Sequence, residues 1–281
     1  MDNLLKKHAK SFYWASFFLS KKILKKSAIL YNFCRTLDDI ADNKGDLKHK
    51  KEKFLKFKED FLNKNFQNLI VSDMYSIIET EKIQKKVILD LFDGIEMDLQ
   101  ENVNINSKKD LLIYSYRVAG TVGLMMSKIL KVKDKEALKG AIHLGIAMQL
   151  TNIARDVNED KDSNRKYINA EFSSIIQTLK DAEFFYKISF SSISKIPLRS
   201  RFAVIVARRL YKKIGDHILR HKDIQNYNNA GKIYVPFASK LNETLLSIFD
   251  FLKLFFVSNI NCDNDEYHGI LAKEINFNER V

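Results

Sequence analysis

Apolar positions recur at intervals of three and four residues over long stretches of this 281-residue chain. The clearest stretches are 111–130, 136–158, 171–194 and 199–222. This period matches one face of an α-helix, whereas the strict alternation and hairpin turns of half-buried strands are missing. Only two prolines and nine glycines interrupt the pattern. The chain is therefore predicted to be all-α.

The gaps between these stretches predict the loops and the domain organisation. Loops are expected near 43–47, 102–108, 159–168, 195–198 and 226–236, the last two marked by Pro197 and Pro236. The sequence contains no repeat of fixed period and no Pro/Ser-rich linker, and 46% of its residues are hydrophobic. A single domain over 1–281 is favoured. Its extreme C-terminus, about 262–281, is a candidate flexible tail.

Two aspartate pairs with the same spacing stand out in the helical pattern. Asp38 pairs with Asp42, and Asp156 pairs with Asp160. Four residues span about one helical turn, so each pair projects two carboxylates from one face. Two like charges at this spacing cost a few tenths of a kcal/mol unless something lies between them. Carboxylate oxygens suit Mg²⁺, which often completes its shell with phosphate oxygens. Solvated acidic helix ends are the alternative for either pair alone.

Each pair continues into a stripe of polar residues along its helix. The second stripe consists of Gln149, Asn152, Asp156 and Asp160, and the first of Tyr31, Arg35, Asp38 and Asp42. The neighbouring positions are mostly apolar, so these polar groups need partners where they are buried. A clamp for a metal-bound diphosphate between two facing helices is therefore expected.

At these residues the chain resembles the squalene/phytoene synthase family of head-to-head prenyl synthases. The matching motifs are Y-N-F-C-R-T-L-D-D-I-A-D (31–42), Y-S-Y-R-V-A-G-T-V-G (114–123) and the stretch 149–160. Weaker matches are H-A-K-S-F (8–12), D-G-I-E-M-D-L (93–99) and A-R-R-L-Y-K-K-I-G-D (207–216). They follow the family's order over most of the first 220 residues. Asn169 departs from the proline or serine that the family usually has after its arginine–tyrosine motif.

The resemblance implies a single-domain helical isoprenoid synthase fold with a central apolar cavity. It also implies a prenyltransferase that uses Mg²⁺, with Mn²⁺ as a possible substitute. The metal ligands that it indicates are Asp38, Asp42, Asn152, Asp156 and Asp160. Arg35, Arg155 and Arg165 would grip phosphate oxygens in the fork geometry of a guanidinium.

The remaining site residues are expected to bind the substrate or stabilise a carbocation. Tyr31 and Tyr114 would do so through their rings or hydroxyls, and Gln149 would position metal, water or an intermediate. Tyr167 follows Arg165 in the same motif and is expected to bind substrate. The expected tunnel residues are Phe12, Ser16, Ala28, Gly120 and Gly123. The last two, together with Ala119, would either let helices approach closely or kink the helix that lines the tunnel.

Small side chains at Ser16 and Ala28 favour a long substrate tail. The chain is therefore expected to condense two C20 geranylgeranyl diphosphates to phytoene, through a cyclopropylcarbinyl diphosphate, without NADPH. One alternative is a squalene or dehydrosqualene synthase that uses two C15 farnesyl diphosphates. The other is a non-catalytic assembly or scaffold protein of the same fold.

The formal net charge of +12 raises the question of anionic partners. Residues 1–60 hold fifteen Lys/Arg against eight Asp/Glu. No zinc-finger spacing, RNP-type aromatic string or basic region with heptads accompanies the charge, so nucleic acid is not an expected partner. Peripheral contact with the inner face of an anionic membrane suits a greasy substrate and remains open. The most apolar region, 248–260, is expected to be a core helix rather than a membrane-surface helix.

The remaining constellations predict no further chemistry. Cys34 and Cys262 lie far apart and imply neither a disulfide nor a zinc site, which fits a reducing cytoplasm. His217 and His221 lack a third ligand. A third acidic cluster is expected only to border the site; it comprises Asp90, Asp93, Glu96 and Asp98. No uncharged run reaches the roughly 18 residues of a spanning helix. The oligomeric state stays open, with a monomer favoured.

Overall fold

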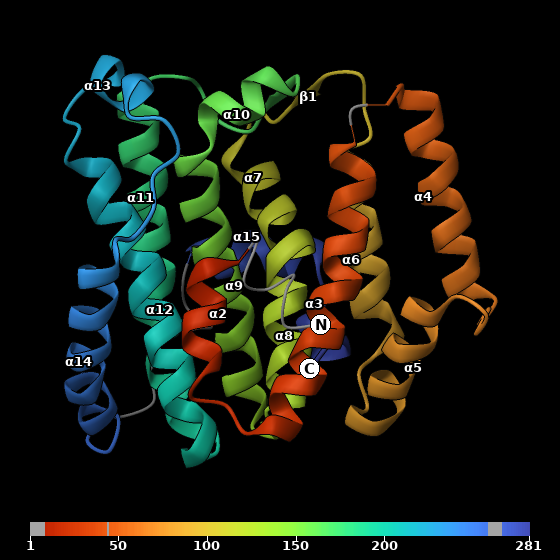
Figure 1. Ribbon diagram of the computed structural model, residues 1–281, viewed down its shortest axis with the longest axis horizontal. Helices are drawn as coiled ribbons and strands as arrows, with labels where there is room; N and C mark the ends of the chain where they lie inside the picture. Colours follow the sequence, from red (N-terminus) through yellow and green to blue (C-terminus); the bar gives the residue numbers. More distant parts are fainter. Residues whose placement is uncertain (1–8, 44, 258–265) are drawn as a thin grey trace.

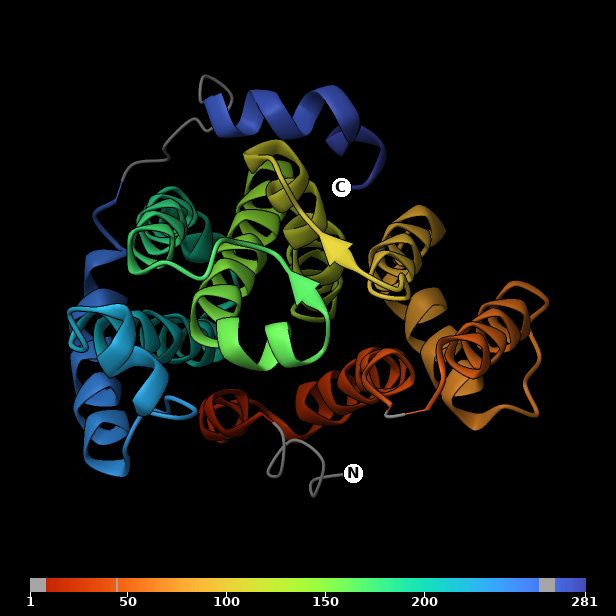
Figure 2. The same cartoon turned by 90° about the horizontal axis from the view of Figure 1, so that it is seen from above.

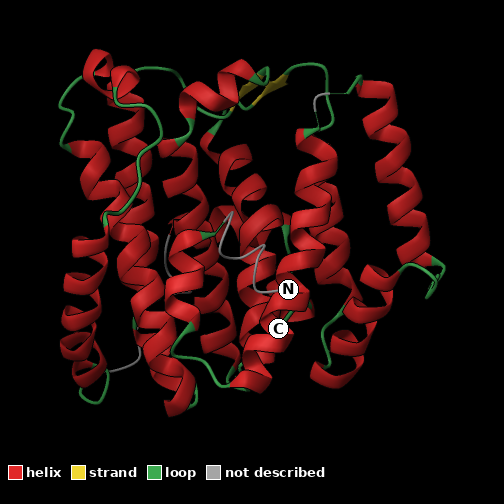
Figure 3. Ribbon diagram, viewed as in Figure 1, coloured by secondary structure: helices red, strands yellow, loops and turns green. Residues whose placement is uncertain are grey.

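The computed structural model describes residues 9–43, 45–257 and 266–281, in which helices form nearly all of the regular structure (Figures 1 and 3). The first helices are α2 (Lys10–Ser16), α3 (Lys21–Asp42), α4 (Leu47–Leu62), α5 (Leu69–Glu81), α6 (Lys85–Met97), α7 (Lys108–Ser115), η1 (Tyr116–Gly120) and α8 (Thr121–Ile129). They are followed by α9 (Lys135–Arg155), α10 (Val157–Asp162), α11 (Phe172–Ile188), η2 (Ser191–Lys195), α12 (Leu198–Leu219), α13 (Ile224–Asn229), α14 (Phe237–Lys253), α15 (Glu266–Glu274) and η3 (Phe277–Glu279). The predicted all-α fold is confirmed.

Side-chain caps explain where several of these helices begin. Ser20 accepts a hydrogen bond from the Ile23 amide at the start of α3, and Asp134 accepts one from the Ala137 amide at the start of α9. Such a cap satisfies an amide that has no partner within the first turn. Helix α3, which carries the first aspartate pair, and α9, which leads into the second, are therefore both anchored at their N-terminal ends.

Helix α9 is the centre of the bundle. It packs against α8, α11, α12 and η1, and in the view from above α7, α8 and α9 lie in the middle (Figure 2). Helices α2 and α3 lie on one side of this centre, and α15 lies on the opposite side (Figure 2). Because α9 is enclosed, the polar residues near its C-terminal end face protein or an internal cavity.

A short parallel strand pair ties two distant loops together near the top of the bundle in Figure 1. Strand β1 (Val103–Asn104) pairs with β2 (Arg165–Lys166), with Val103 opposite Arg165. Each strand contains only two residues, too few for an alternation of polar and apolar positions to predict it from the sequence. They hold the segment after α10 beside the segment after α6.

Two predicted helices are interrupted, and two predicted loops contain helix. The stretch 111–130 contains the π-helix η1 between α7 and α8, and α9 ends at Arg155, before α10 begins at Val157. The expectation of one continuous helix carrying both members of the second pair was therefore wrong. Helices α10 and α13 lie partly in the loops expected at 159–168 and 226–236. The Tyr227 hydroxyl of α13 lies within hydrogen-bond distance of the Ala154 and Arg155 carbonyl oxygens at the end of α9.

Small residues bring η1 and α8 close to α9. A Cβ on Gly123 would lie 2.3 Å from the carbonyl oxygen of Ala141, and one on Gly145 would lie 2.3 Å from that of Ala119. A Cβ on Gly120 would come within 3.0 Å of the Ile142 side chain. Close helix packing accounts for these glycines, while the π-helix supplies the interruption of the helix.

The C-terminal region differs from the expectations. The core helix expected at 248–260 is wrong where it is described, because α14 lies at the edge of the bundle (Figure 1) with Phe249 and Phe256 62% and 89% exposed. Residues 258–265, including Cys262, lie outside the described residues. From Glu266 onward the expected tail forms α15 and η3, with Leu271 and Phe277 buried. None of the described helices combines the length and apolarity that crossing a bilayer demands.

Candidate active site

A charged cleft and an apolar cavity meet inside the bundle. The cleft has a volume of about 740 Å³, and both aspartate pairs line it. The apolar cavity has a volume of about 360 Å³ and lies between α2, α3, α8, α9 and α12. Tyr31, Asp38, Gln149 and Asn152 line both spaces. A ligand with a charged head and an apolar tail could therefore occupy both at once.

The first aspartate pair lies on the last two turns of α3. Asp42 accepts a hydrogen bond of 2.7 Å from Nη1 of Arg165, whose Nη2 donates to the Ala41 carbonyl oxygen at 3.1 Å. Asp38 lies among protein atoms on the wall of the cleft, to which its side chain is exposed. Burial, followed by the nearby Asp42 carboxylate, raises the pKa of Asp38 to about 7.

The second aspartate pair lies at the junction of α9 and α10. Arg155 donates to both carboxylate oxygens of Asp156, from Nε at 2.7 Å and from Nη2 at 2.5 Å. Asp160 has no such partner; burial and the Asp156 carboxylate raise its pKa to about 8, against the opposing effect of Arg165. Asp42 and Asp98 also contribute to this rise, so carboxylates from separate helices lie close enough to repel one another.

A fifth aspartate, Asp98, lines the same cleft. The Tyr114 hydroxyl donates to it at 2.9 Å and the Tyr167 hydroxyl donates to its other oxygen. The two tyrosine rings stack with centroids 4.7 Å apart. Burial raises the pKa of Asp98 despite Arg165 and the two hydroxyls. The sequence pattern had placed Asp98 only beside the site; its membership of the weak D-G-I-E-M-D-L match was the available signal.

The site suits a cation that is completed by its ligand. Among the described residues, no three His, Cys, Asp or Glu side chains form a group that could hold a metal ion by themselves. Asn152 Oδ1 is buried, however, and has no hydrogen-bond partner. The pKa values of Asp38 and Asp160 are raised by burial and then by the neighbouring carboxylate of each pair. These donors fit Mg²⁺, which keeps waters and takes phosphate oxygens.

The remaining predicted site residues divide between the two spaces. Arg35 lines the cleft, pairs with Asp39 and leaves its buried Nε without a partner. Phe12, Ser16 and Gly123 line the apolar cavity. Ala28 is buried but does not line it, since Ser27, one turn from Tyr31, occupies that position on the wall. Gly120 contacts α9 instead.

Several cleft residues were not indicated by sequence reasoning. Tyr211 from α12 lines both spaces and lay in a weakly matching motif. Lys232 and Tyr234 reach the cleft from the segment after α13. Lys232 pairs with Glu159 and lies 3.8 Å from Asp156. The tertiary fold brings this loop residue to the cleft, and no local sequence pattern indicates such a position. Sequence reasoning therefore could not have found Lys232.

Three members of the third acidic cluster pair with basic residues away from the cleft. Asp90 forms an ion pair with Arg280 and accepts a hydrogen bond of 2.6 Å from the Tyr116 hydroxyl. Asp93 and Glu96 face Lys58. Of this acidic cluster, only Asp98 lines the cleft.

Comparisons with known proteins identify the family of this chain. The family model described as "Squalene/phytoene synthase" matches residues 5–174, which is more than half of the chain. The chain belongs to the squalene/phytoene synthase family. The resemblance drawn from the motifs is thus confirmed, and with it the prediction of a prenyltransferase.

Individual relatives resemble this chain over most of its length. The 15-cis-phytoene synthase of Pantoea ananas is 29% identical over 240 residues, which cover 74% of this chain and 77% of that protein. The 15-cis-phytoene synthase of Enterobacter agglomerans is 29% identical over 253 residues, covering 75% and 82%. Among solved structures, a dehydrosqualene synthase in complex with a ligand is 27% identical, with a TM-score of 0.74 and coverage of 90% and 95%.

Proposed function

We propose that this protein condenses two geranylgeranyl diphosphates head to head to form phytoene, through a cyclopropylcarbinyl diphosphate. The observation that carries the proposal is the direct opening of the charged cleft, with its two aspartate pairs, into an apolar cavity. The phytoene synthases among the relatives support the same reaction.

The cleft residues bind and orient the diphosphate. Arg165 stands at the first aspartate pair and Arg155 at the second, while Arg35 has a free, buried Nε. Guanidinium groups recognise phosphate oxygens through two parallel hydrogen bonds. These three arginines would therefore hold the diphosphate as it leaves C1 of the first substrate.

Mg²⁺, with Mn²⁺ as a substitute, would be held by Asp38, Asp42, Asp156, Asp160 and the free oxygen of Asn152. When bound, it neutralises the diphosphate and improves it as a leaving group. Asp98, fixed by Tyr114 and Tyr167, keeps the base of the cleft negative beside these ligands.

The apolar cavity receives the prenyl tail and excludes water from the allylic cation. Water would quench that cation, so a dry wall is required. Tyr31 lies where the cleft meets the cavity, and its ring is placed to stabilise the cation that the double bond of the second substrate attacks. Gln149, at the same junction, would orient the intermediate for its rearrangement to the C1–C1′ product.

The small residues of the cavity wall favour a C20 tail over a C15 tail. The wall includes Ser16, Ser27, Gly123, Ser127, Ala137, Gly140 and Ala141. The likeness to a solved dehydrosqualene synthase supports the second candidate, condensation of two C15 farnesyl diphosphates. A squalene synthase would in addition need NADPH for its reductive last step.

Product identification tests the proposal. The purified chain is incubated with Mg²⁺ and either C20 or C15 diphosphate, with and without NADPH, and the extracted hydrocarbon is identified by mass spectrometry. Phytoene from the C20 substrate without NADPH is expected. A C30 product as the main one would favour the second candidate, and no product from either substrate would favour the non-catalytic alternative.

A further inference from the structure

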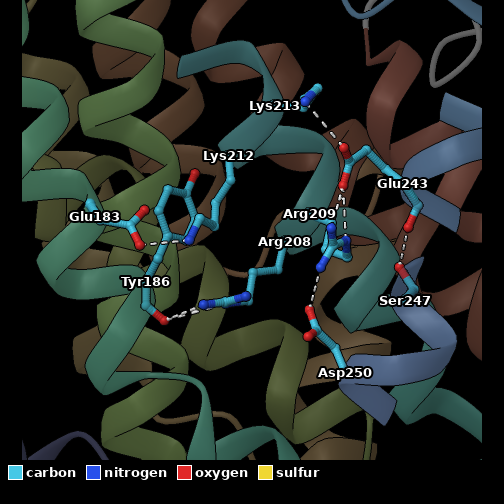
Figure 4. A network of polar contacts seen from close by, with 9 residues as sticks. All are labelled: Glu183, Tyr186, Arg208, Arg209, Lys212, Lys213, Glu243, Ser247 and Asp250. Atoms are coloured by element: carbon cyan, nitrogen blue, oxygen red, sulfur yellow. Dashed lines mark hydrogen bonds and ion pairs between the residues drawn. The ribbon is translucent and has the colours of Figure 1, made fainter. Parts of the chain in front are cut away.

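Helix α14 has its polar side turned toward the protein. Arg209 of α12 donates to Glu243 at 2.9 Å and to Asp250 at 2.8 Å, and Lys213 lies 3.4 Å from Glu243 (Figure 4). The Ser247 hydroxyl donates to the Glu243 carbonyl oxygen on the same side. Glu243, Ser247 and Asp250 are all buried. Charged pairs therefore help to fix α14 to the bundle, together with the apolar contact of Phe251 with Phe202.

The outward side of α14 is apolar along its whole length. Its exposed side chains are Phe237, Leu241, Leu245, Ile248, Phe249 and Leu252, followed by Phe255 and Phe256 just beyond the helix. Leu245 and Phe249 are 63% and 62% exposed. A helix on the surface of a protein in water normally places its apolar stripe against the core. Contiguous exposed apolar surface of this kind marks a contact with a partner or a lipid surface.

The apolar surface continues from α14 onto neighbouring elements. Phe18, at the turn after α2, packs on Phe202 with ring centroids 5.0 Å apart. Phe202 in turn contacts Phe251 of α14 at 6.2 Å, and Phe251 contacts Phe255 at 5.6 Å. The exposed Phe18 therefore stands near the C-terminal end of α14. The exposed Phe17 precedes it in the chain, and the exposed Leu198 lies one turn before Phe202 on α12. We call the apolar side chains of α14, with these three, the outer face.

In the three described segments that carry the outer face, the exposed charges are of one sign. In segments 10–27, 194–202 and 237–257 the only acidic residues are Glu243 and Asp250, and both are buried against Arg209. The exposed charged residues of these segments are Lys10, Lys21, Lys22, Lys25, Lys195, Arg199 and Lys253. An anionic lipid surface complements this arrangement, because basic residues near a membrane bind its acidic headgroups. A second copy would bring basic residues opposite basic residues.

We propose that the outer face docks this protein on an anionic lipid bilayer, with α14 lying in the plane of the interface. Apolar side chains on one side and basic residues at the edges are typical of interfacial helices. Helix α14 packs on α12, and Ala203, Val204 and Ala207 of α12 line the apolar cavity. Docking would thus bring the cavity close to the membrane, which dissolves the tail and the hydrocarbon product; this reason for choosing lipid rests on the proposed function.

Vesicle binding by matched variants tests the proposal. The full chain is sedimented with vesicles of phosphatidylcholine containing phosphatidylglycerol and with vesicles of phosphatidylcholine alone. The test variant is Leu245→Gln/Phe249→Gln. The control is Leu55→Gln/Leu69→Gln, which changes two leucines that are 56% and 76% exposed on α4 and α5, at the opposite edge from α14 (Figure 1). A charge variant, Arg199→Glu/Lys253→Glu, tests the headgroup contribution.

Wild type and the control are expected to bind the anionic vesicles more tightly than the neutral ones. The Leu245→Gln/Phe249→Gln variant should bind at least about 30-fold more weakly, because two large apolar side chains no longer enter the lipid. The charge variant should lose the preference for anionic vesicles, and salt should weaken binding by wild type. Unchanged circular dichroism and melting temperature show that the variants fold.

Three outcomes would overturn the docking surface. The first is that wild type binds neither kind of vesicle. The second is that the α14 variant and the control lose vesicle binding equally. The third is that wild type forms a dimer in solution and that, of the variants, only the α14 variant is monomeric. Condensation assayed in detergent micelles separates this proposal from the proposed function. Product without vesicle binding would sink docking alone, and vesicle binding without product would sink the proposed function alone.

Discussion

The two aspartate pairs share a spacing but are built on different backbones. Asp38 and Asp42 lie on one uninterrupted helix, α3, whereas Asp156 lies at the break between α9 and α10 and Asp160 lies beyond it. In both pairs, nevertheless, the two carboxylates differ from each other in the same way. Asp42 and Asp156 are each held by an arginine, and Asp38 and Asp160 each have a raised pKa.

The source of the arginine is the main difference between the pairs. Arg155 precedes Asp156 in the chain and serves its own pair, whereas Arg165 follows the second pair and reaches across to Asp42. The second pair and Arg165 belong to one segment of chain, held in place by the β1–β2 pairing. Arg165 thus joins the segment that follows the second pair to the end of α3, where the first pair lies.

Removal of single carboxylates should have the largest effect. Asp38→Ala, Asp42→Ala, Asp156→Ala and Asp160→Ala should each reduce turnover by on the order of 10²–10³-fold, because stabilisation of the departing diphosphate is lost. Steady-state rates with saturating Mg²⁺ measure the loss, and circular dichroism controls for folding. Near-wild-type turnover in any two of the four variants would contradict a joint role of the pairs.

Replacement of the arginines by lysine should reduce turnover by different amounts at the two pairs. Arg165→Lys keeps the charge but loses the fork that joins Asp42 and Ala41, and turnover should fall by about 10–100-fold. Arg35→Lys should behave similarly, and Arg155→Lys should lose less, since its fork is local. Melting temperatures should barely move. A collapse of the melting temperature with normal activity per folded molecule would mean that these arginines form structural ion pairs.

Changes in the apolar cavity should leave both pairs intact and alter chain-length preference. Ser16→Phe or Ser27→Phe should shift the ratio of kcat/KM from C20 toward C15 diphosphate, since overpacking an apolar pocket costs about 1–3 kcal/mol. The dependence on Mg²⁺ should not change. A wild-type preference for C15, or an equal loss of both substrates in the variants, would show that these residues do not face the tail.

The smallest expected effect is on the pH dependence of stability, and it follows from the raised pKa values of Asp38 and Asp160. The ordinary aspartate pKa is about 3.9, so the folded metal-free protein binds more protons at Asp38 and Asp160 than the unfolded chain does between about pH 4 and pH 8. These two groups therefore lower stability as pH rises through that window. Relative to Asp38→Asn and Asp160→Asn, the metal-free wild type should lose a few degrees of melting temperature.

Thermal melts in EDTA at several pH values measure this difference. Addition of Mg²⁺ with inorganic diphosphate should remove it, because the bound cation offsets the repulsion between the carboxylates. Melting curves of wild type and the Asn variants that stay parallel across this pH range would show that Asp38 and Asp160 are not raised in pKa.

Features encoded by local periodicity could be predicted from the sequence. The stripe of α3 was correct as far as Tyr31 because an unbroken helix preserves spacing. One turn further the position was misassigned to Ala28 instead of Ser27, since steps of three and four are equally compatible with a helical face. A core helix was favoured over a membrane-surface helix for 248–260, but Asp250 is buried against Arg209, which turns the apolar side of α14 outward.

Features created by packing could not be predicted. The break of the helix at Asp156 and the π-helix at Tyr116–Gly120 carry no proline or glycine pattern strong enough to indicate them. Asp98 enters the cleft because the β1–β2 pairing places Tyr167 beside it. Contacts between segments separated by tens of residues have no periodic signature, and most of the missing site residues belong to this class.

Binding of inorganic diphosphate tests most directly whether the two pairs form one site. Calorimetric titrations with Mg²⁺ present compare wild type with Asp38→Asn/Asp42→Asn and with Asp156→Asn/Asp160→Asn. Wild type should bind diphosphate only when Mg²⁺ is present, and each double variant should lose that binding although it retains the other pair. Full Mg²⁺-dependent binding by either double variant would contradict the account, because one pair would then suffice.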